Sequence, residues 1–161
     1  MIMPPKSETR IKRLHEFRVQ KDPVLEAARK LDNEFPGAIS LLPQSATLYH
    51  HSNNLSGLLS SGVFDSAFTE HGAFFFTDAP IPSRTNCTVA IPVPLVLIER
   101  NALLKSDISW EEASIKGIDG RFIHDTGEPF AKIAEEQFAT EIAIFNGSLP
   151  KLGSVSQYRF S

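Results

Sequence analysis

The chain has 161 residues and a net charge of −3, and 42% of its residues are hydrophobic. This length and apolar content are typical of a single globular domain with its own core, and they exclude disorder throughout. No apolar run reaches the ~20 residues that a membrane helix needs. The single cysteine, Cys87, excludes a disulfide framework and a cysteine-rich metal site, so we expect a protein of a reducing compartment such as the cytoplasm.

Positive charge is concentrated in residues 1–30, which hold eight Lys and Arg against four Asp and Glu. Such a basic arm can bind nucleic acid or membrane phosphates, or it can pack as a solvated helix on its own acidic domain. We favour the second interpretation. We divide the chain into a tail with a basic helical segment over 1–40 and a domain over 41–161.

The N-terminal segment predicts two helices. Within 9–19, three apolar residues are spaced by threes and indicate a weak helix. A stronger helix begins at Asp22-Pro23, an N-cap followed by proline at the first helical position, and ends at Pro36-Gly37. Its apolar residues are Val24, Leu25, Ala28, Leu31 and Phe35.

A strand, a helix and a second strand are expected next. The first strand covers 47–50, and the helix after it is capped by Ser52 or Asn53 and stops at Gly62. The segment 73–77 contains three consecutive phenylalanines, and it is too short and too apolar for anything but a buried strand.

The second half of the chain predicts further strands and one longer helix. We expect a strand over 88–93 that Pro92 and Pro94 push to an edge or a bulge, a strand or short helix over 95–104, a helix turn over 109–112, an extended segment over 121–124, a helix over 129–138, a strand over 140–145, a turn at Asn146-Gly147 and a strand over 154–160. Five or six strands with small helices between them favour an α+β fold with a mixed or antiparallel sheet.

The common nucleotide and hydrolase motifs are missing from the sequence. There is no phosphate-binding loop with Lys-Ser/Thr, no Gly-x-Gly-x-x-Gly, no His-Glu-x-x-His and no Gly-x-Ser-x-Gly. We therefore predict no metal site, and any phosphate site must be built in a different way.

Two groups of side chains have both a structural and a functional interpretation. His50 and His51 are neighbours on a strand and point to opposite faces, so they cannot both bind one metal ion. Such a histidine is more often a hydrogen-bonded structural residue than a catalytic one. Phe74, Phe75 and Phe76 are typical of core packing, and their functional alternative is an aromatic wall for a planar ring.

Glu141 stands out because it lies in an otherwise uncharged strand. Alternation puts Glu141, Ala143 and Phe145 on one face of that strand. The carboxylate is either an edge-strand charge that opposes aggregation or a buried functional acid. Three residues before the predicted helix can line the same cleft: Arg121, His124 and Asp125.

Three motifs occur in order over about residues 47–160. They are Tyr49-His50-His51-Ser52 with the helix end Leu58-Leu59-Ser60-Ser61-Gly62, then Gly72-Ala73-Phe74-Phe75-Phe76-Thr77-Asp78, and last Thr140-Glu141-Ile142-Ala143-Ile144. The set resembles the ADP-ribosyltransferase superfamily. Members similar to the poly-ADP-ribose polymerases carry a Tyr-His-Gly-Ser/Thr strand end, an Ile/Leu-Leu-x-x-Gly helix end, a Gly-x-Tyr-Phe-Thr/Ala-Asp strand and a late strand that begins with the catalytic Glu.

The resemblance implies an α+β fold with a mixed or antiparallel split β-sheet and small flanking helices. It implies an NAD-dependent mono-ADP-ribosyltransferase, a glycosyltransferase that moves ADP-ribose from NAD to a macromolecular acceptor. Glu141 and His50 are then the expected catalytic residues: Glu141 stabilises the charge on the reacting ribose, and His50 holds the adenosine ribose. The residues expected to bind NAD are Tyr49, His50, Ser52, Phe75, Phe76 and Thr77.

The chain departs from the family pattern at three positions. His51 replaces the glycine that follows the histidine, and Phe75 replaces the tyrosine of the second motif. Ala139 stands where arginine-specific members have an acid, so an arginine target is not expected. A catalytically silent protein- or nucleic-acid-binding module of the same fold is the alternative. A third hypothesis is an unrelated α+β domain whose His, Phe and Glu are structural.

The same residues also resemble the DarT toxins, which modify single-stranded DNA. The likeness rests on His50, on Asn54-Leu55 and on Phe122-Ile123-His124-Asp125. It implies a bacterial toxin or effector that acts in the cytoplasm or is secreted into a host or target cell, and an antidote protein as a possible partner. The acceptor, a protein or a nucleic acid, stays open, and no membrane span is expected.

Overall fold

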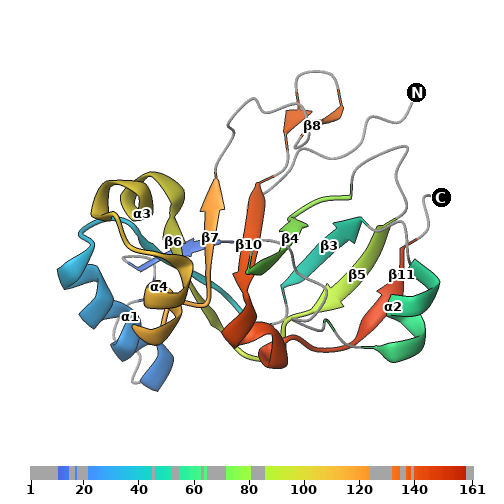
Figure 1. The fold of residues 1–161 in the computed structure, drawn as a ribbon, viewed down its shortest axis with the longest axis horizontal. Coiled ribbons are helices and arrows are strands. Elements are labelled where there is room, and N and C mark those ends of the chain that lie inside the picture. The colour runs from blue at the N-terminus through green and yellow to red at the C-terminus, as the bar shows by residue number, and fades with distance from the viewer. Residues whose placement is uncertain are drawn as a thin grey trace.

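The computed structural model describes residues 11–14, 17, 22–44, 46–51, 55–62, 64, 72–80, 86–123, 132–134, 137–138 and 140–158. Within them the chain is an α+β protein with a nine-stranded, mixed and mostly antiparallel sheet and small helices (Figure 1). The strand order is β1-β2-β6-β7-β10-β4-β3-β5-β11, and β8 and β9 form a separate two-stranded sheet. The only parallel pair recorded among these strands is β6 with β7.

The elements follow in chain order. They are β1 (Lys12–Arg13), α1 (Pro23–Glu34), β2 (Ile39–Leu42), β3 (Thr47–His51), α2 (Leu55–Ser61), β4 (Ala73–Thr77), β5 (Asn86–Ala90), β6 (Leu95–Glu99), α3 (Arg100–Ser106), α4 (Trp110–Ile115), β7 (Gly120–Ile123), β8 (Lys132–Ala134), β9 (Gln137–Phe138), β10 (Glu141–Phe145), the 3-10 helix η4 (Asn146–Lys151) and β11 (Val155–Gln157).

Helix α1 forms where its capping signals predict it. The Asp22 side chain accepts hydrogen bonds from the backbone N–H groups of Val24 at 2.7 Å and Leu25 at 3.4 Å, and Pro23 occupies the first helical position. Four of the five predicted apolar residues are buried, Leu25, Ala28, Leu31 and Phe35, and Val24 is partly buried against the same core.

The sheet has two differently covered faces. Ala143 and Phe145 of β10 lie on the side that packs against α1, α3 and α4, which we call the helix face. Ile142 and Ile144 lie on the other side, in a core that extends from β2 to β5 and includes Leu149 of η4; we call it the far face. The predicted alternation along β10 is therefore confirmed.

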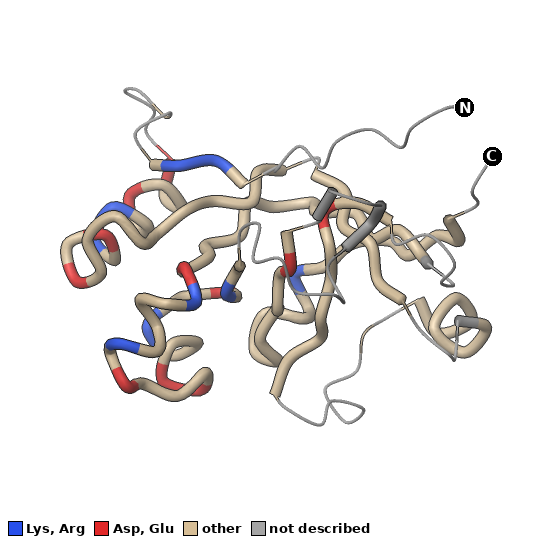
Figure 2. Tube along the Cα trace, turned by 90° about the horizontal axis from the view of Figure 1, so that it is seen from above, with Lys and Arg blue, Asp and Glu red and all other residues tan. Residues whose placement is uncertain are grey.

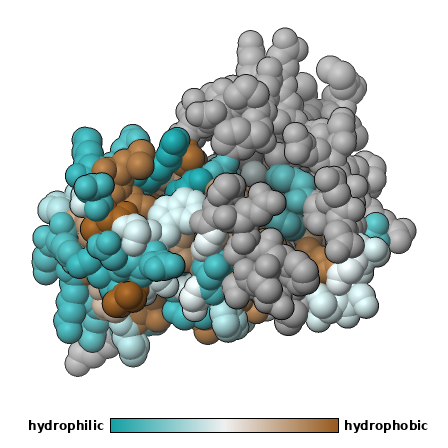
Figure 3. Space-filling model, in the orientation of Figure 1, coloured by the Kyte–Doolittle hydropathy of each residue, from teal (hydrophilic) through white to brown (hydrophobic). Residues whose placement is uncertain are grey.

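Charge is distributed unevenly over this architecture. Most Lys, Arg, Asp and Glu of the described residues lie on the half of the molecule that carries α1, α3 and α4, and the strands around β3 and β5 hold few (Figure 2). The surface over these helices is mainly hydrophilic, with isolated hydrophobic spots (Figure 3).

No helix among the described residues is long and apolar enough to cross a membrane.

Of the neighbouring strands in the nine-stranded sheet, β3 and β4 share the fewest register pairs. These two strands share one register pair, Tyr49 with Thr77, whereas β3 and β5 share five pairs and β4 and β10 also share five. Beyond that pair the imidazole of His50 lies between the strands, and its Nδ1 is 2.8 Å from the carbonyl oxygen of Phe75. The side chain thus adds a hydrogen bond between β3 and β4 beside their one register pair.

Three helix and turn predictions need correction. Within the predicted helix over 129–138, residues 132–134 and 137–138 form the strand pair β8–β9, because hairpin pairing supplies the backbone hydrogen bonds that a helix would otherwise make. Lys12–Arg13 pair with β2 as a strand instead of joining a helix over 9–19. The turn expected at Asn146-Gly147 is the start of η4.

The remaining strand limits shift by a few residues. β5 covers Asn86–Ala90 and not 88–93, so both prolines stay outside it, and β5 pairs on both sides with β3 and β11. The uncertain segment 95–104 contains a strand followed by a helix. β2 has no counterpart among the predicted elements.

Gly120 is the position at which the sheet tolerates no side chain. A Cβ there would lie 2.3 Å from the carbonyl oxygen of Ala143 and 3.1 Å from a methyl group of Leu97. We expect Gly120→Ala to lower the free energy of unfolding by about 2 kcal/mol, since overpacking forces backbone to move. Urea unfolding measures the loss. Gly37→Ala is the comparison variant: a Cβ at Gly37 meets no atom within 4 Å, so any loss of stability there comes from its φ of 74° and not from a clash.

Candidate functional site

The buried ion pair between Glu141 and Arg121 lies at the centre of the helix face. Arg121 Nη2 donates to Glu141 Oε1 at 2.6 Å, and both side chains are less than a tenth exposed. Glu141 is opposite Ile123 on β7, and Arg121 is opposite Ala143 on β10, so the pair is a diagonal contact between neighbouring strands. Burial lowers the pKa of the Arg121 guanidinium, and the charge of Glu141 raises it again.

Two aromatic rings enclose the Arg121 guanidinium. Its central carbon lies 5.5 Å from the centre of the Phe75 ring and 5.8 Å from that of Trp110, within the range of cation–π contacts. The two rings are themselves 6.1 Å apart, and Trp110 also packs on Phe145 at 5.4 Å. The arginine that holds Glu141 is therefore fixed on three sides.

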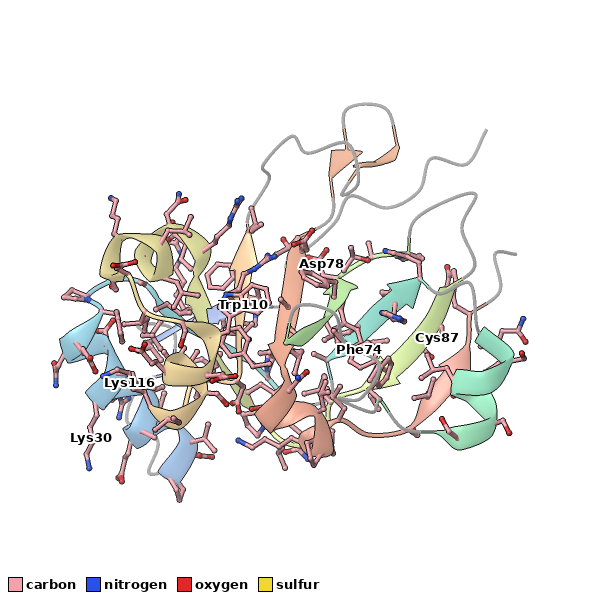
Figure 4. All side chains as sticks on the ribbon, viewed as in Figure 1. Lys30, Phe74, Asp78, Cys87, Trp110 and Lys116 are labelled. Atoms are coloured by element: carbon pink, nitrogen blue, oxygen red, sulfur yellow. The ribbon has the colours of Figure 1, made fainter. Side chains whose placement is uncertain are left out.

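A cavity of about 360 Å³ opens beside this ion pair. We call it the Glu141 cavity, and it lies between α3, α4 and the strands β7 and β10. Trp110 separates it from a larger and more open hollow of about 660 Å³ at the base of η4. Figure 4 shows the Trp110 side chain beside β7 and β10. The cavity is lined by Arg100, Leu103, Leu104, Trp110, Arg121, Ile123 and Glu141.

Asp78 fixes the start of β10 immediately before Glu141. Its Oδ1 accepts a hydrogen bond from the backbone N–H of Thr140 at 2.9 Å, and its own N–H donates to the Thr140 carbonyl at 3.2 Å. Asp78 is 4% exposed and lies at the end of β4 (Figure 4). The second motif and the acid of the third are thus joined by direct hydrogen bonds, which set the position of Glu141.

His50 does not lie with Glu141. Tyr49 is paired with Thr77, which is paired in turn with Glu141, so these three share the helix face. Strand alternation then sends His50 to the far face, where its ring lies 5.3 to 5.6 Å from the ring centres of Phe64, Phe74 and Phe76. The expected convergence of His50 and Glu141 in one cleft is absent, because the register fixes opposite faces.

We expect His50 to make the stability of the protein depend on pH. Burial is the main cause that lowers its pKa from the ordinary 6.5. Below pH 6.5 the imidazole is protonated in the unfolded chain but stays neutral in the native state. The free energy of unfolding therefore falls as the pH falls, by up to about 1.4 kcal/mol per pH unit. We expect His50→Gln, whose amide can still donate to Phe75, to remove this part of the slope in urea unfolding from pH 7 to pH 5. An unchanged slope contradicts it.

Other predicted NAD-binding residues are distributed over both faces. Phe75 is half-buried on the helix face, while Phe76 is fully buried on the far face. Thr77 is 3% exposed and its hydroxyl donates to the carbonyl of Ala79 at 2.6 Å, so that proton is already engaged. His51 shares the face of Tyr49 by alternation. Ser52 lies outside the described residues.

Cys87 takes no part in this site. It is fully buried on the far face opposite His50, and burial raises the pKa of its thiol to about 11. A thiol with such a pKa is protonated at neutral pH and is a poor nucleophile.

The sequence did not predict that Glu141 pairs with Arg121, or that two aromatic rings enclose this arginine. The sequence places Arg121 near the cleft and Trp110 in a helix turn, and it pairs neither of them with Glu141. The available signal was alternation along 121–123, which puts Arg121 on one face of β7. His124 and Asp125 lie outside the described residues.

Comparisons with known proteins gave no match. No family model, no curated protein and no solved structure is similar enough to this chain to be recognised.

Proposed function

We propose that the protein is an NAD-dependent mono-ADP-ribosyltransferase with Glu141 as its catalytic carboxylate. The observation that supports this most is the position of Glu141. It is a buried acid at the start of a central strand, paired with Arg121, lining a cavity and following the order of motifs of the superfamily. A structural gatekeeper would lie on an edge strand, whereas β10 is flanked by β4 and β7.

The chemistry needs one fixed negative charge. Cleavage of the bond between nicotinamide and ribose passes through an oxocarbenium-like state, and nicotinamide leaves with the bonding electron pair. A carboxylate held near the ribose stabilises the positive charge that develops there. Arg121 and the Asp78–Thr140 hydrogen bonds hold the Glu141 carboxylate in place before the reaction begins. The acceptor then attacks the ribose carbon and loses its proton to solvent.

The faces of the sheet revise which residues would contact NAD. We propose that the dinucleotide extends over the helix face from Glu141 across Thr77 to Tyr49, in line with the register of β10, β4 and β3. His51 then replaces His50 as the histidine on the ribose side, and Phe75 alone gives nicotinamide its apolar wall. The structure has one nine-stranded sheet in which β3 and β4 share a single register pair, and the split sheet that the resemblance implies stays a proposal.

The acceptor is a macromolecule, and a bacterial toxin or effector is the role that the resemblance suggests. The direct test is release of nicotinamide from NAD by the purified protein, with and without DNA, RNA or cell extract as acceptors. Transfer of a labelled ADP-ribose group to one acceptor class is the expected result. Neither NAD binding nor nicotinamide release with any acceptor would exclude the proposal.

A catalytically silent binding module is the second candidate. It is favoured by the same ion pair, because Arg121 occupies Glu141 Oε1 and leaves the side chain only 9% exposed. NAD binding that raises the melting temperature in a nicotinamide-sensitive way would count against a module without an NAD site. Nicotinamide release would exclude it.

A further inference from the structure

One donor of the buried ion pair has no partner among the described residues. Arg121 Nη2 binds Glu141, but Nη1 is buried and has no hydrogen-bond acceptor in the described part of the chain. An unsatisfied donor on a charged group is costly in a protein interior, and native structures rarely keep one without a reason. Arg121 is 6% exposed and lines the Glu141 cavity, so an acceptor can approach its guanidinium from that cavity, and a rotation of the side chain would bring the covered Nη1 to it.

The charges of the cavity also lack balance. Among the described lining residues, two are arginines, Arg100 and Arg121, and one is acidic, Glu141. The charge of Arg100 contributes to lowering the pKa of Arg121, so the two cations repel each other across this space. One negative charge between them would relieve the repulsion and satisfy Nη1 at the same time.

The remaining walls of the cavity are apolar. Leu103 and Leu104 of α3 and Ile123 of β7 line one part, and the indole of Trp110 lines another. The volume of about 360 Å³ is within the range of small-molecule sites. A flat apolar group fits these walls, while an oxyanion fits beside the two arginines of the lining.

We infer that the Glu141 cavity binds a ligand that carries an oxyanion, a carboxylate or a phosphate ester, next to a flat apolar group. Arg121 Nη1 donates to the oxyanion and Arg100 adds a second charge. The cavity lies on the β7 side of Glu141, and Tyr49 lies on the β4 side. If Glu141 acts as proposed above, this ligand is the anionic part of the acceptor; that step alone rests on the proposed function.

Trp110 makes the test direct, because it is the single tryptophan of the chain and lines the cavity. Benzoate and phenyl phosphate, titrated into the wild-type protein, are expected to change its fluorescence saturably. Benzyl alcohol, which has the ring but no charge, is the matched neutral probe and is expected to bind at least about tenfold more weakly. These measurements need no NAD.

Arg100→Gln is the informative variant, because Arg100 is exposed and its loss leaves the core intact. We expect it to raise the dissociation constant of benzoate about tenfold. Lys105→Gln removes the same charge from the same helix outside the cavity lining, and it should leave binding unchanged. Arg121→Lys keeps the charge and loses the planar fork, and it should also weaken binding, with circular dichroism confirming the fold.

Three results would overturn the inference. They are no saturable change with either anion, equal binding of benzyl alcohol and benzoate, or equal weakening by Arg100→Gln and Lys105→Gln. Displacement of benzoate by NAD would overturn its assignment to the acceptor, since the cavity would then belong to the dinucleotide. Nicotinamide release without anion binding would overturn this inference and leave the proposed function standing. Anion binding without nicotinamide release would support this inference and count against the proposed function.

Discussion

Glu141→Gln is expected to lower nicotinamide release by about 10²–10³-fold while NAD still binds. The amide has nearly the shape of the carboxylate and can still accept a hydrogen bond from Arg121. What it lacks is the negative charge that stabilises the reacting ribose. Turnover and NAD affinity are measured separately, by nicotinamide release and by calorimetry. Unchanged turnover would remove Glu141 from the mechanism.

The same change has a structural cost that must be separated from the chemical one. Glu141→Gln leaves the buried Arg121 cation without its counter-charge, and breaking such a pair costs about 3–5 kcal/mol. Activity is therefore compared at a temperature at which circular dichroism shows both proteins folded. Glu26→Gln, on an exposed position of α1, is the matched control and should match the wild type in both measurements.

Asp119→Ala is expected to lower the free energy of unfolding by about 3 kcal/mol, because buried donors lose a charged acceptor. Asp119 is 3% exposed, and its carboxylate accepts from Val96 N at 2.7 Å, from Ser148 Oγ at 2.5 Å and from Lys151 Nζ at 2.8 Å. These bonds fasten β6 and η4 to the segment before β7. Urea unfolding monitored by circular dichroism gives the loss.

Variants of two residues that donate to Asp119 show how much each hydrogen bond contributes to the free energy of unfolding. Ser148→Ala removes one buried donor and is expected to cost about 1 kcal/mol. Lys151→Gln should change stability little, since the lysine side chain is half exposed and surface ion pairs contribute little. A Lys151→Gln effect as large as that of Asp119→Ala would contradict a network in which the buried donors dominate.

Local patterns predicted those elements whose signals are contained in a short segment. Asp22-Pro23 cap α1 as expected, Ala73–Thr77 form β4, and Glu141 begins β10. The hairpin β8–β9 was mistaken for a helix because a few apolar residues fit either periodicity, and pairing between strands decides. β2 is four buried residues that follow Pro36-Gly37 after one alanine, and it is too short to show a period.

The candidate site depends on the register of the strands, which is set by pairing between distant segments and cannot be predicted from one segment alone. Sequence reasoning placed His50 and His51 on opposite faces, and the structure confirms this. Which of the two shares a face with Glu141 is decided by the pairing of Tyr49 with Thr77, between residues 28 positions apart. The Arg121–Glu141 contact joins residues 20 positions apart on neighbouring strands. Arg121 alone, seen in the sequence, has no visible partner.

The one-pair junction between β3 and β4 has a consequence for motion. The β3–β5–β11 part of the sheet is bonded internally by complete ladders, but few backbone bonds join it to the rest. We expect amide protons beside this junction to exchange with heavy water sooner than those of β10, which has ladders on both sides. Faster exchange beside this junction than in β10 would identify it as the place at which the sheet opens first.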